Sequence, residues 1–260
     1  MNFSGASRTF RGAPFFSKLQ LRFAGYTFSQ KEKGGNKMHF RHEWKHLIGP
    51  ADLLALRARL SAVMLRDHHA ADGSYQVRSL YFDNLADKAL REKIDSVNCR
   101  EKFRIRYYGQ DISRILLEKK SKINGLCSKS QTCLTTSEAQ AAACGDLQAL
   151  ANAENPLLQE LYRKMTIQGL RPKTIVDYTR EPFIYPPGNV RVTLDHHIRT
   201  ALSCLDFLDP DSLTIPVRDM PIILEVKWDE FLPAVIRDIV QTPGVRTTAF
   251  SKYAACRIYG

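Results

Sequence analysis

Basic residues alternate with apolar residues in several segments of this sequence, as in a strand with one positively charged face. In the segment REKFRIRYYG, basic residues stand at every second position: Lys102, Arg104 and Arg106. Because strand side chains alternate between faces, these three lie on one face, opposite Phe103 and Ile105. Guanidinium groups match phosphate oxygens in pairs. This spacing therefore suggests binding of a phosphate-containing anion.

The same pattern recurs on five further segments. Any one charged strand face is more often a solvated surface than a site. Repetition over six strands favours a site, because like charges opposite one another on neighbouring strands destabilise a sheet. A few carboxylates on these faces would suit a divalent metal that bridges phosphate oxygens. The positions are Arg41, Glu43 and Lys45; Glu118, Lys120 and Lys122; Tyr178 and Arg180; Arg191, Thr193 and Asp195; and Glu225 and Lys227.

The elements that carry these residues read as one antiparallel α+β domain. Short connections and turn residues between the strands favour hairpins over alternating βαβ units. If the sheet closes into a barrel, its apolar side packs on helices and its basic side faces an interior that a polyanion would fill. We expect strands at 40–48, 75–84, 101–109, 113–125, 173–185, 190–200, 213–217 and 222–228, and helices at 51–64, 137–151, 155–168, 232–241 and 251–257.

Composition excludes some classes of protein. The net charge is +11, but residues 1–37 hold seven Lys or Arg and one Glu, so they supply +6. The basic field of residues 38–260 is thus weak evidence for a nucleic-acid partner, and the aromatic residues are not interleaved with the basic ones as base-stacking would need. The six cysteines form no CxxC pair, which predicts free thiols in a reducing cytoplasm. No apolar run reaches the roughly 18 residues of a membrane helix.

The first 37 residues are predicted to be a leader that is disordered or absent from the native protein. KEKGGNKM, residues 31–38, could be encoded by a purine-rich run like a bacterial ribosome-binding site, which makes Met38 the expected start. The domain is therefore expected to span 38–260.

An ordered set of motifs resembles the vacuolar transporter chaperone (VTC) domain, the polyphosphate polymerase branch of the CYTH or triphosphate tunnel metalloenzyme superfamily. The resemblance covers about Phe40 to Arg257, nearly all of the chain after Met38. The motifs are FRHEWKHLI, VRSLYFDN, REKFRIRYYG, LLEKKSKINGLCSKS, DYTREPF, RVTLD, LEVKW and SKYAACR.

The resemblance implies an eight-stranded antiparallel barrel tunnel with flanking helices, which binds ATP, triphosphate or polyphosphate with Mn²⁺ or Mg²⁺. It implies transfer of the ATP γ-phosphate to a polyphosphate chain, with Arg104, Arg106, Lys120 and Glu225 as catalytic residues. Glu225 and Glu43 would hold the metal. The first strand has Arg41 where many superfamily triphosphatases have a glutamate, which suits the polymerase branch. The phosphate-binding residues implied are Lys45, Arg104, Arg106, Lys120, Lys129, Arg180, Arg191 and Lys252.

Two other functions remain open from the sequence. One is hydrolysis of inorganic triphosphate, and the other is non-catalytic binding of polyphosphate or nucleotide in the same site. The oligomeric state and a separate membrane partner also stay open. His196 and His197 next to Asp195 would suit a metal site, but neighbouring strand residues point to opposite faces, so a structural role is expected.

Overall fold

The computed structural model describes residues 41–257 except 71, 125, 202 and 243–246. The unit Met38–Gly260 is compact in itself. The prediction of a leader at 1–37 lies outside the described residues. Among those residues, no helix is both long and apolar enough to cross a bilayer.

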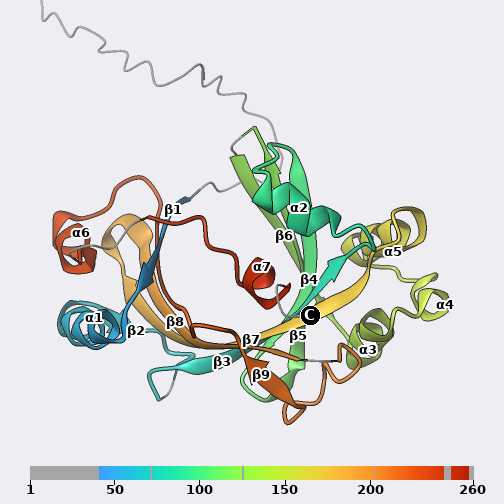
Figure 1. Ribbon diagram of the computed structural model, residues 1–260, viewed down its shortest axis with the longest axis horizontal. Helices are drawn as coiled ribbons and strands as arrows, with labels where there is room; N and C mark the ends of the chain where they lie inside the picture. Colours follow the sequence, from blue (N-terminus) through green and yellow to red (C-terminus); the bar gives the residue numbers. More distant parts are fainter. Residues whose placement is uncertain (1–40, 71, 125, 202, 243–246, 258–260) are drawn as a thin grey trace, which may run out of the picture. The chain divides into compact units, whose positions relative to one another are not determined.

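A single antiparallel sheet dominates this unit (Figure 1). Its main path runs β1-β10-β8-β7-β3-β4-β5-β6, while the short β2 pairs with β7 and the short β9 with β8. The strands are β1 His42–Ile48, β2 Leu65–Arg66, β3 Tyr75–Asp83, β4 Arg100–Tyr108, β5 Asp111–Ile123, β6 Leu126–Leu134, β7 Arg171–Tyr185, β8 Val190–Ala201, β9 Thr214–Pro216 and β10 Ile222–Trp228.

The predicted barrel is not closed, and its count of eight strands is not confirmed. The sheet has ten strands, and the strands at the ends of its path, β1 and β6, do not pair with each other in the described part of the chain. Closure would need hydrogen bonds between strands some 80 residues apart in sequence. Hydrophobic alternation does not report such pairing, because it fixes only which face of a strand is buried.

Within the described residues, seven helices and one 3₁₀ turn accompany the sheet. The predicted helix at 137–151 is two helices, because Gly145 takes a left-handed φ of 72° and ends the first one. The first begins after Thr135, which shares a capping box with Glu138. The elements are α1 Pro50–Val63, α2 Lys88–Ile94, α3 Thr136–Cys144, α4 Leu147–Leu150, α5 Pro156–Ile167, η1 Pro187–Asn189, α6 Ala234–Val240 and α7 Lys252–Arg257.

The helices other than α2 and α7 pack on one face of the sheet and form two cores there. In the first core, α5 buries Leu158, Leu161 and Met165, one stripe of that helix, against Phe103 and Ile105 of β4. In the second core, residues of α1 and α6 pack on β8 and β10. These cores cover the apolar faces of the strands, so the charged faces lie on the other side.

The short helix α7 packs on the charged side, which we call the concave face (Figure 1). Its residues Tyr253 and Cys256 are buried with Val77, Val176 and Tyr178 of β3 and β7. The hydroxyl of Tyr253 also donates to Asp83, 2.7 Å away. The last helix of the chain thus brings Lys252 to the middle of the concave face.

Candidate functional site

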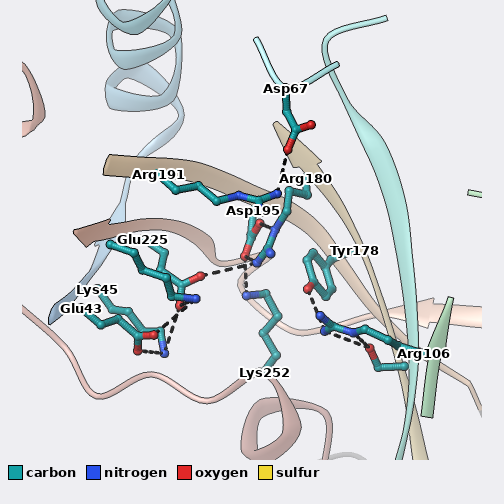
Figure 2. Close-up of polar contacts among 12 residues, drawn as sticks. Glu43, Lys45, Asp67, Arg106, Tyr178, Arg180, Arg191, Asp195, Glu225 and Lys252 are labelled. Carbon is teal, nitrogen blue, oxygen red and sulfur yellow. Dashed lines mark hydrogen bonds and ion pairs between the residues drawn. The ribbon is translucent and has the colours of Figure 1, made fainter. Parts of the chain in front are cut away.

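Strand register places the predicted site residues on the concave face. Lys45 lies opposite Glu225 in the β1–β10 pair, and Arg180 lies opposite Asp195 in the β7–β8 pair. On the other half of the sheet, Arg104 lies opposite Glu118. Figure 2 shows the first half of this face, with side chains from β1, β7, β8, β10 and α7 turned toward one another.

Glu225 lies at the centre of one ionic cluster. Its carboxylate is 3.4 Å from the Lys45 ammonium, 3.2 Å from that of Lys227 and 3.6 Å from the Arg180 guanidinium. Burial would raise the pKa of Glu225, but Lys227 and Lys45 hold it well below its ordinary value. Lys45 also contacts Glu43, and the two carboxylates raise the pKa of Lys45 in spite of its burial. Glu225 and Lys45 are therefore both charged.

Asp195 joins β7 to α7. Its fully buried carboxylate accepts two hydrogen bonds of 2.7 Å from Arg180 and one of 2.6 Å from Lys252 (Figure 2). Burial alone would raise the pKa of Asp195, but Arg180 and Lys252 lower it. A paired arginine and a helix-borne lysine are thus fixed in position before any ligand binds.

A second ionic cluster surrounds Glu118 on β4, β5 and β6. This fully buried carboxylate lies 2.6 Å from Arg104, 3.8 Å from Arg106 and 2.6 Å from Lys129. Burial would raise the pKa of Glu118, but Arg104 and Arg106 lower it strongly. Arg104 also donates to the Tyr81 hydroxyl, 2.8 Å away. The predicted pair of arginines is therefore oriented by hydrogen bonds on several sides.

Arg191 lies apart from both clusters. Its guanidinium donates to Asp67, as Figure 2 shows, and also to the Tyr75 hydroxyl, each 3.0 Å away. Seven of the eight predicted phosphate-binding residues therefore have a carboxylate within 4.0 Å: Lys45, Arg104, Arg106, Lys129, Arg180, Arg191 and Lys252.

Lys120 is the exception, and its cross-strand neighbour Lys102 is like it. The two residues lie directly opposite each other on β4 and β5. In the described part of the chain, neither ammonium has a carboxylate within ion-pair distance. Burial, and then Arg104 and Lys227, lower the pKa of Lys120 well below its ordinary value. Burial also lowers the pKa of Lys102, together with Arg104 and Lys45. Positive charge on this part of the face is thus uncompensated.

These electrostatic effects also show how the sheet curves. Lys45 on β1 acts on Lys102 on β4, and Lys227 on β10 acts on Lys120 on β5. The strands involved are separated by at least three others along the sheet path. Such coupling requires the two halves of the concave face to approach each other through space.

The donor set on the concave face fits a hard divalent cation. Glu43 and Glu225 lie together, since both contact Lys45 and Lys227. Carboxylate oxygens suit Mg²⁺ and Mn²⁺, and Mg²⁺ commonly takes one or two carboxylates with the remaining ligands from water and phosphate. Among the described residues, a group of three side chains with metal-ligand atoms within 4.8 Å occurs at Asp67, His68 and His69, outside this pair.

At the two adjacent histidines the strand is irregular, so the regular alternation of faces expected from the sequence does not hold there. Asp177 and Thr179 flank a shift of register opposite His197, which has a left-handed φ of 51°. The irregularity brings the two rings together, with 3.0 Å between the Nδ1 atoms of His196 and His197. His196 also contacts Glu181, away from the Glu225 cluster, and a structural role for it stays a prediction.

Three residues that contact the arginines, Ser79, Tyr81 and Tyr108, were not among those predicted, whereas Tyr178 was expected on the Arg180 face. The hydroxyls of Tyr81, Ser79, Tyr108 and Tyr178 all accept hydrogen bonds from Arg104 or Arg106. Alternation in YQVRSLYFDN places Ser79 and Tyr81 on one face of a strand. This pattern was the sequence signal that could have identified them as site residues. Their contact with the arginines depends on the β3–β4 register, which the sequence does not specify.

The comparison with known families decides the classification, since the model of the VTC domain matches residues 40–258. The chain belongs to the VTC domain family. This confirms the resemblance drawn from the motifs. No curated protein matches this VTC domain.

Two solved structures are among those to which this chain is similar. One is a Bacillus halodurans protein with a provisional adenylate cyclase assignment, at 16% identity and a TM-score of 0.45, over 73% of this chain and 80% of that one. Another is the PH1819 protein of Pyrococcus horikoshii OT3, at 12% identity and a TM-score of 0.44, over 83% of this chain and 97% of that one. At these values the similarity does not bear on the activity of the VTC domain.

Proposed function

We propose that this VTC domain is a polyphosphate polymerase-type phosphotransferase that moves the γ-phosphate of ATP onto a polyphosphate chain. The observation that carries the proposal is a concave face with oriented arginines beside two lysines, Lys102 and Lys120, that have no carboxylate partner in the described chain. A phosphate chain is the kind of ligand that would neutralise these lysines while hydrogen bonding to the arginines. Membership of the VTC family supports this choice.

In the proposed reaction, a terminal oxygen of the acceptor chain attacks the γ-phosphorus of ATP. The bond between this phosphorus and the β–γ bridging oxygen breaks, and ADP leaves with the electron pair. No nucleophilic side chain is needed, because phosphoryl transfer depends on alignment and on stabilisation of charge at the phosphate oxygens. Arg104 and Arg106 would supply that stabilisation, and Lys120 would add an uncompensated positive charge.

Pre-organisation is the physical advantage of this arrangement. Glu118 and Tyr81 hold Arg104 in place at 2.6 Å and 2.8 Å. Donors that are already oriented need no reorganisation when charge develops in the transition state, and they act strongly in a buried site. We propose the same role for Arg180, which Asp195 fixes through two hydrogen bonds.

Glu225 and Glu43 would hold the divalent metal, Mn²⁺ or Mg²⁺. The metal would neutralise negative charge on the phosphate oxygens of ATP. The neighbouring Lys45 and Lys227 would then bind phosphate oxygens in place of the carboxylates they contact in the structure. Arg41 does not add to this site, since it pairs with Asp229 at 2.8 Å. Because Arg41 stands where many superfamily triphosphatases have a glutamate, the first strand supplies one carboxylate fewer, which favours transfer over two-metal hydrolysis.

The full chain incubated with ATP and Mn²⁺ tests the proposal when the products are separated on a gel. Long phosphate chains are the expected product. Arg104→Ala should lower the initial rate by about 100-fold, the usual effect of losing one donor to the transition state. Arg114→Ala is the control, because Arg114 is an exposed residue of β5. Glu225→Gln should abolish the metal-dependent rate.

Other products would contradict the polymerase assignment. Orthophosphate released from triphosphate, with no chains from ATP, would make the protein a triphosphatase. Tight polyphosphate binding without either product would make it a binding module. Full turnover by Glu225→Gln would show that the metal assignment is wrong.

A further inference from the structure

Beyond the Arg104 cluster, a row of basic residues continues along the concave face toward α2. Two residues further along β4 from Arg104 stands Lys102, and two further stands Arg100. Arg100 lies directly opposite Lys122 of β5. Since two residues of a strand span roughly 7 Å, this row extends about 14 Å past Arg104.

Lys93 of α2 adds a positive charge to this row. Helix α2 lies over this end of β4 in Figure 1. Burial, and then Arg100, Lys45 and Lys122, lower the pKa of Lys93, so these cations lie close enough to repel its charge. Glu43, a carboxylate that raises the pKa of Lys93 slightly against these effects, is already shared with Lys45 and Lys227.

The described chain offers no ion-pair partner for Lys93, Lys102 or Lys122. This differs from the rest of the face, where Glu118, Asp195 and Glu225 neutralise the arginines. Like charges opposite one another on neighbouring strands destabilise a sheet, so a row of unpaired cations is costly to the protein alone. A bound polyanion would remove that cost.

A purely structural reason exists for one of these lysines. Lys93 is in the last turn of α2, where a positive charge stabilises the helix dipole. Arg91 is in the same turn and can fill that role alone. The dipole also gives no reason for Lys102 or Lys122, which are on strands.

We propose that Lys93, Lys102 and Lys122 form a second anion subsite, which holds phosphates of a linear polyphosphate beyond those bound at Arg104 and Arg106. The inference rests on the proposed function, because it assumes that a phosphate chain occupies the concave face. It adds that the chain leaves the Arg104 cluster toward α2 and that chain length contributes to affinity.

Calorimetric titration of the full chain with tripolyphosphate and with long-chain polyphosphate tests this subsite. The double variant Lys93→Ala, Lys122→Ala should bind the long chain roughly tenfold more weakly, with a shallower salt dependence, since each lysine that contacts phosphate adds to that slope. Its affinity for tripolyphosphate should change by less than about twofold. Arg91→Ala is the matched control and should bind both ligands as the unaltered chain does.

Thermal unfolding without phosphate shows whether the variant is folded. Its melting temperature should equal or exceed that of the unaltered chain, because the substitutions remove repulsion. Equal loss of affinity for the two ligands, or no loss for either, would overturn the subsite. If the unaltered chain bound neither ligand, the proposed function itself would fail.

Discussion

At the scale of single residues, the basic groups of the concave face fall into two kinds. Arg104, Arg180 and Lys252 are paired with buried carboxylates and fixed in place. Lys102 and Lys120 have no such partner among the described residues and their pKa values are lowered. Paired groups give geometry to a site, whereas unpaired groups give it net charge, and a phosphate ligand needs both.

Tyr81 allows a test of this electrostatic environment. Burial would raise its pKa, but Arg104 and Lys102 lower the pKa of Tyr81 to about 8. The unfolded phenol loses its proton near pH 10, so between these values the unfolded chain binds more protons. The free energy of unfolding should therefore rise between about pH 8 and pH 10, by at most about 2.7 kcal/mol from this group.

Denaturant unfolding across this pH range, without phosphate, measures the effect. The lowered pKa values of Lys102 and Lys120 act in the same direction. Tyr81→Phe should flatten the rise, while Tyr162→Phe on α5 should leave it unchanged. Equal pH slopes for the Tyr81→Phe variant and the unaltered chain would contradict the assigned environment.

At the scale of elements, the turn between β7 and β8 connects the ends of several strands. Gly188 in η1 has a φ of 73°, and an added Cβ would overlap the carbonyl oxygen of Phe231. The same turn accepts a hydrogen bond from Asp229, which also pairs with Arg41 before β1. The close approach at Gly188 thus lets one turn hold the ends of β1, β8 and β10 together.

Gly188→Ala should lower the free energy of unfolding by about 3 kcal/mol or more, because overpacking adds to backbone strain. Gly109→Ala is the matched control. Gly109 also has a positive φ, 62°, but its added Cβ would meet nothing within 4 Å, so about 1 kcal/mol of strain is expected. Denaturant unfolding of both variants measures the difference. Equal losses would show that the contact with Phe231 does not matter.

Local sequence patterns predicted much of the secondary structure. Alternation identified the charged faces of β4 and β5, because one face of each strand packs on α5. It missed α2, a seven-residue helix too short for a clear apolar period, and the break at Gly145 in the Ala-rich region. Alternation also failed at His197, where an irregular backbone interrupts the period of two.

The pairing of charged side chains on the concave face could not be predicted from the sequence. That Asp195 neutralises both Arg180 and Lys252 depends on long-range register and on where α7 packs. The sequence therefore suggested a uniformly basic face. The structure instead has most arginines neutralised, while Lys102 and Lys120 have no carboxylate partner among the described residues.

At the scale of the folded unit 38–260, curvature of the sheet creates the site. β1 and β10 approach β4 and β5 through space without pairing with them in the described residues, as the effect of Lys227 on Lys120 shows. Neither half of the sheet has both the paired carboxylates at Glu43 and Glu225 and the paired arginines at Arg104 and Arg106. Phosphoryl transfer as proposed needs both halves around one ligand.

The central claim is that a phosphate chain binds on the concave face, and lysine modification tests it most directly. The full chain is treated with an amine-acetylating reagent, with and without tripolyphosphate, and each lysine is quantified by mass spectrometry. We predict that Lys102 and Lys120 react readily in the free protein, because their lowered pKa values favour the neutral amine, and that tripolyphosphate protects them. Lys88, an exposed residue of α2 that pairs with Glu92, should react equally in both conditions. Unchanged reactivity of Lys102 and Lys120, with protection at exterior lysines instead, would contradict the account.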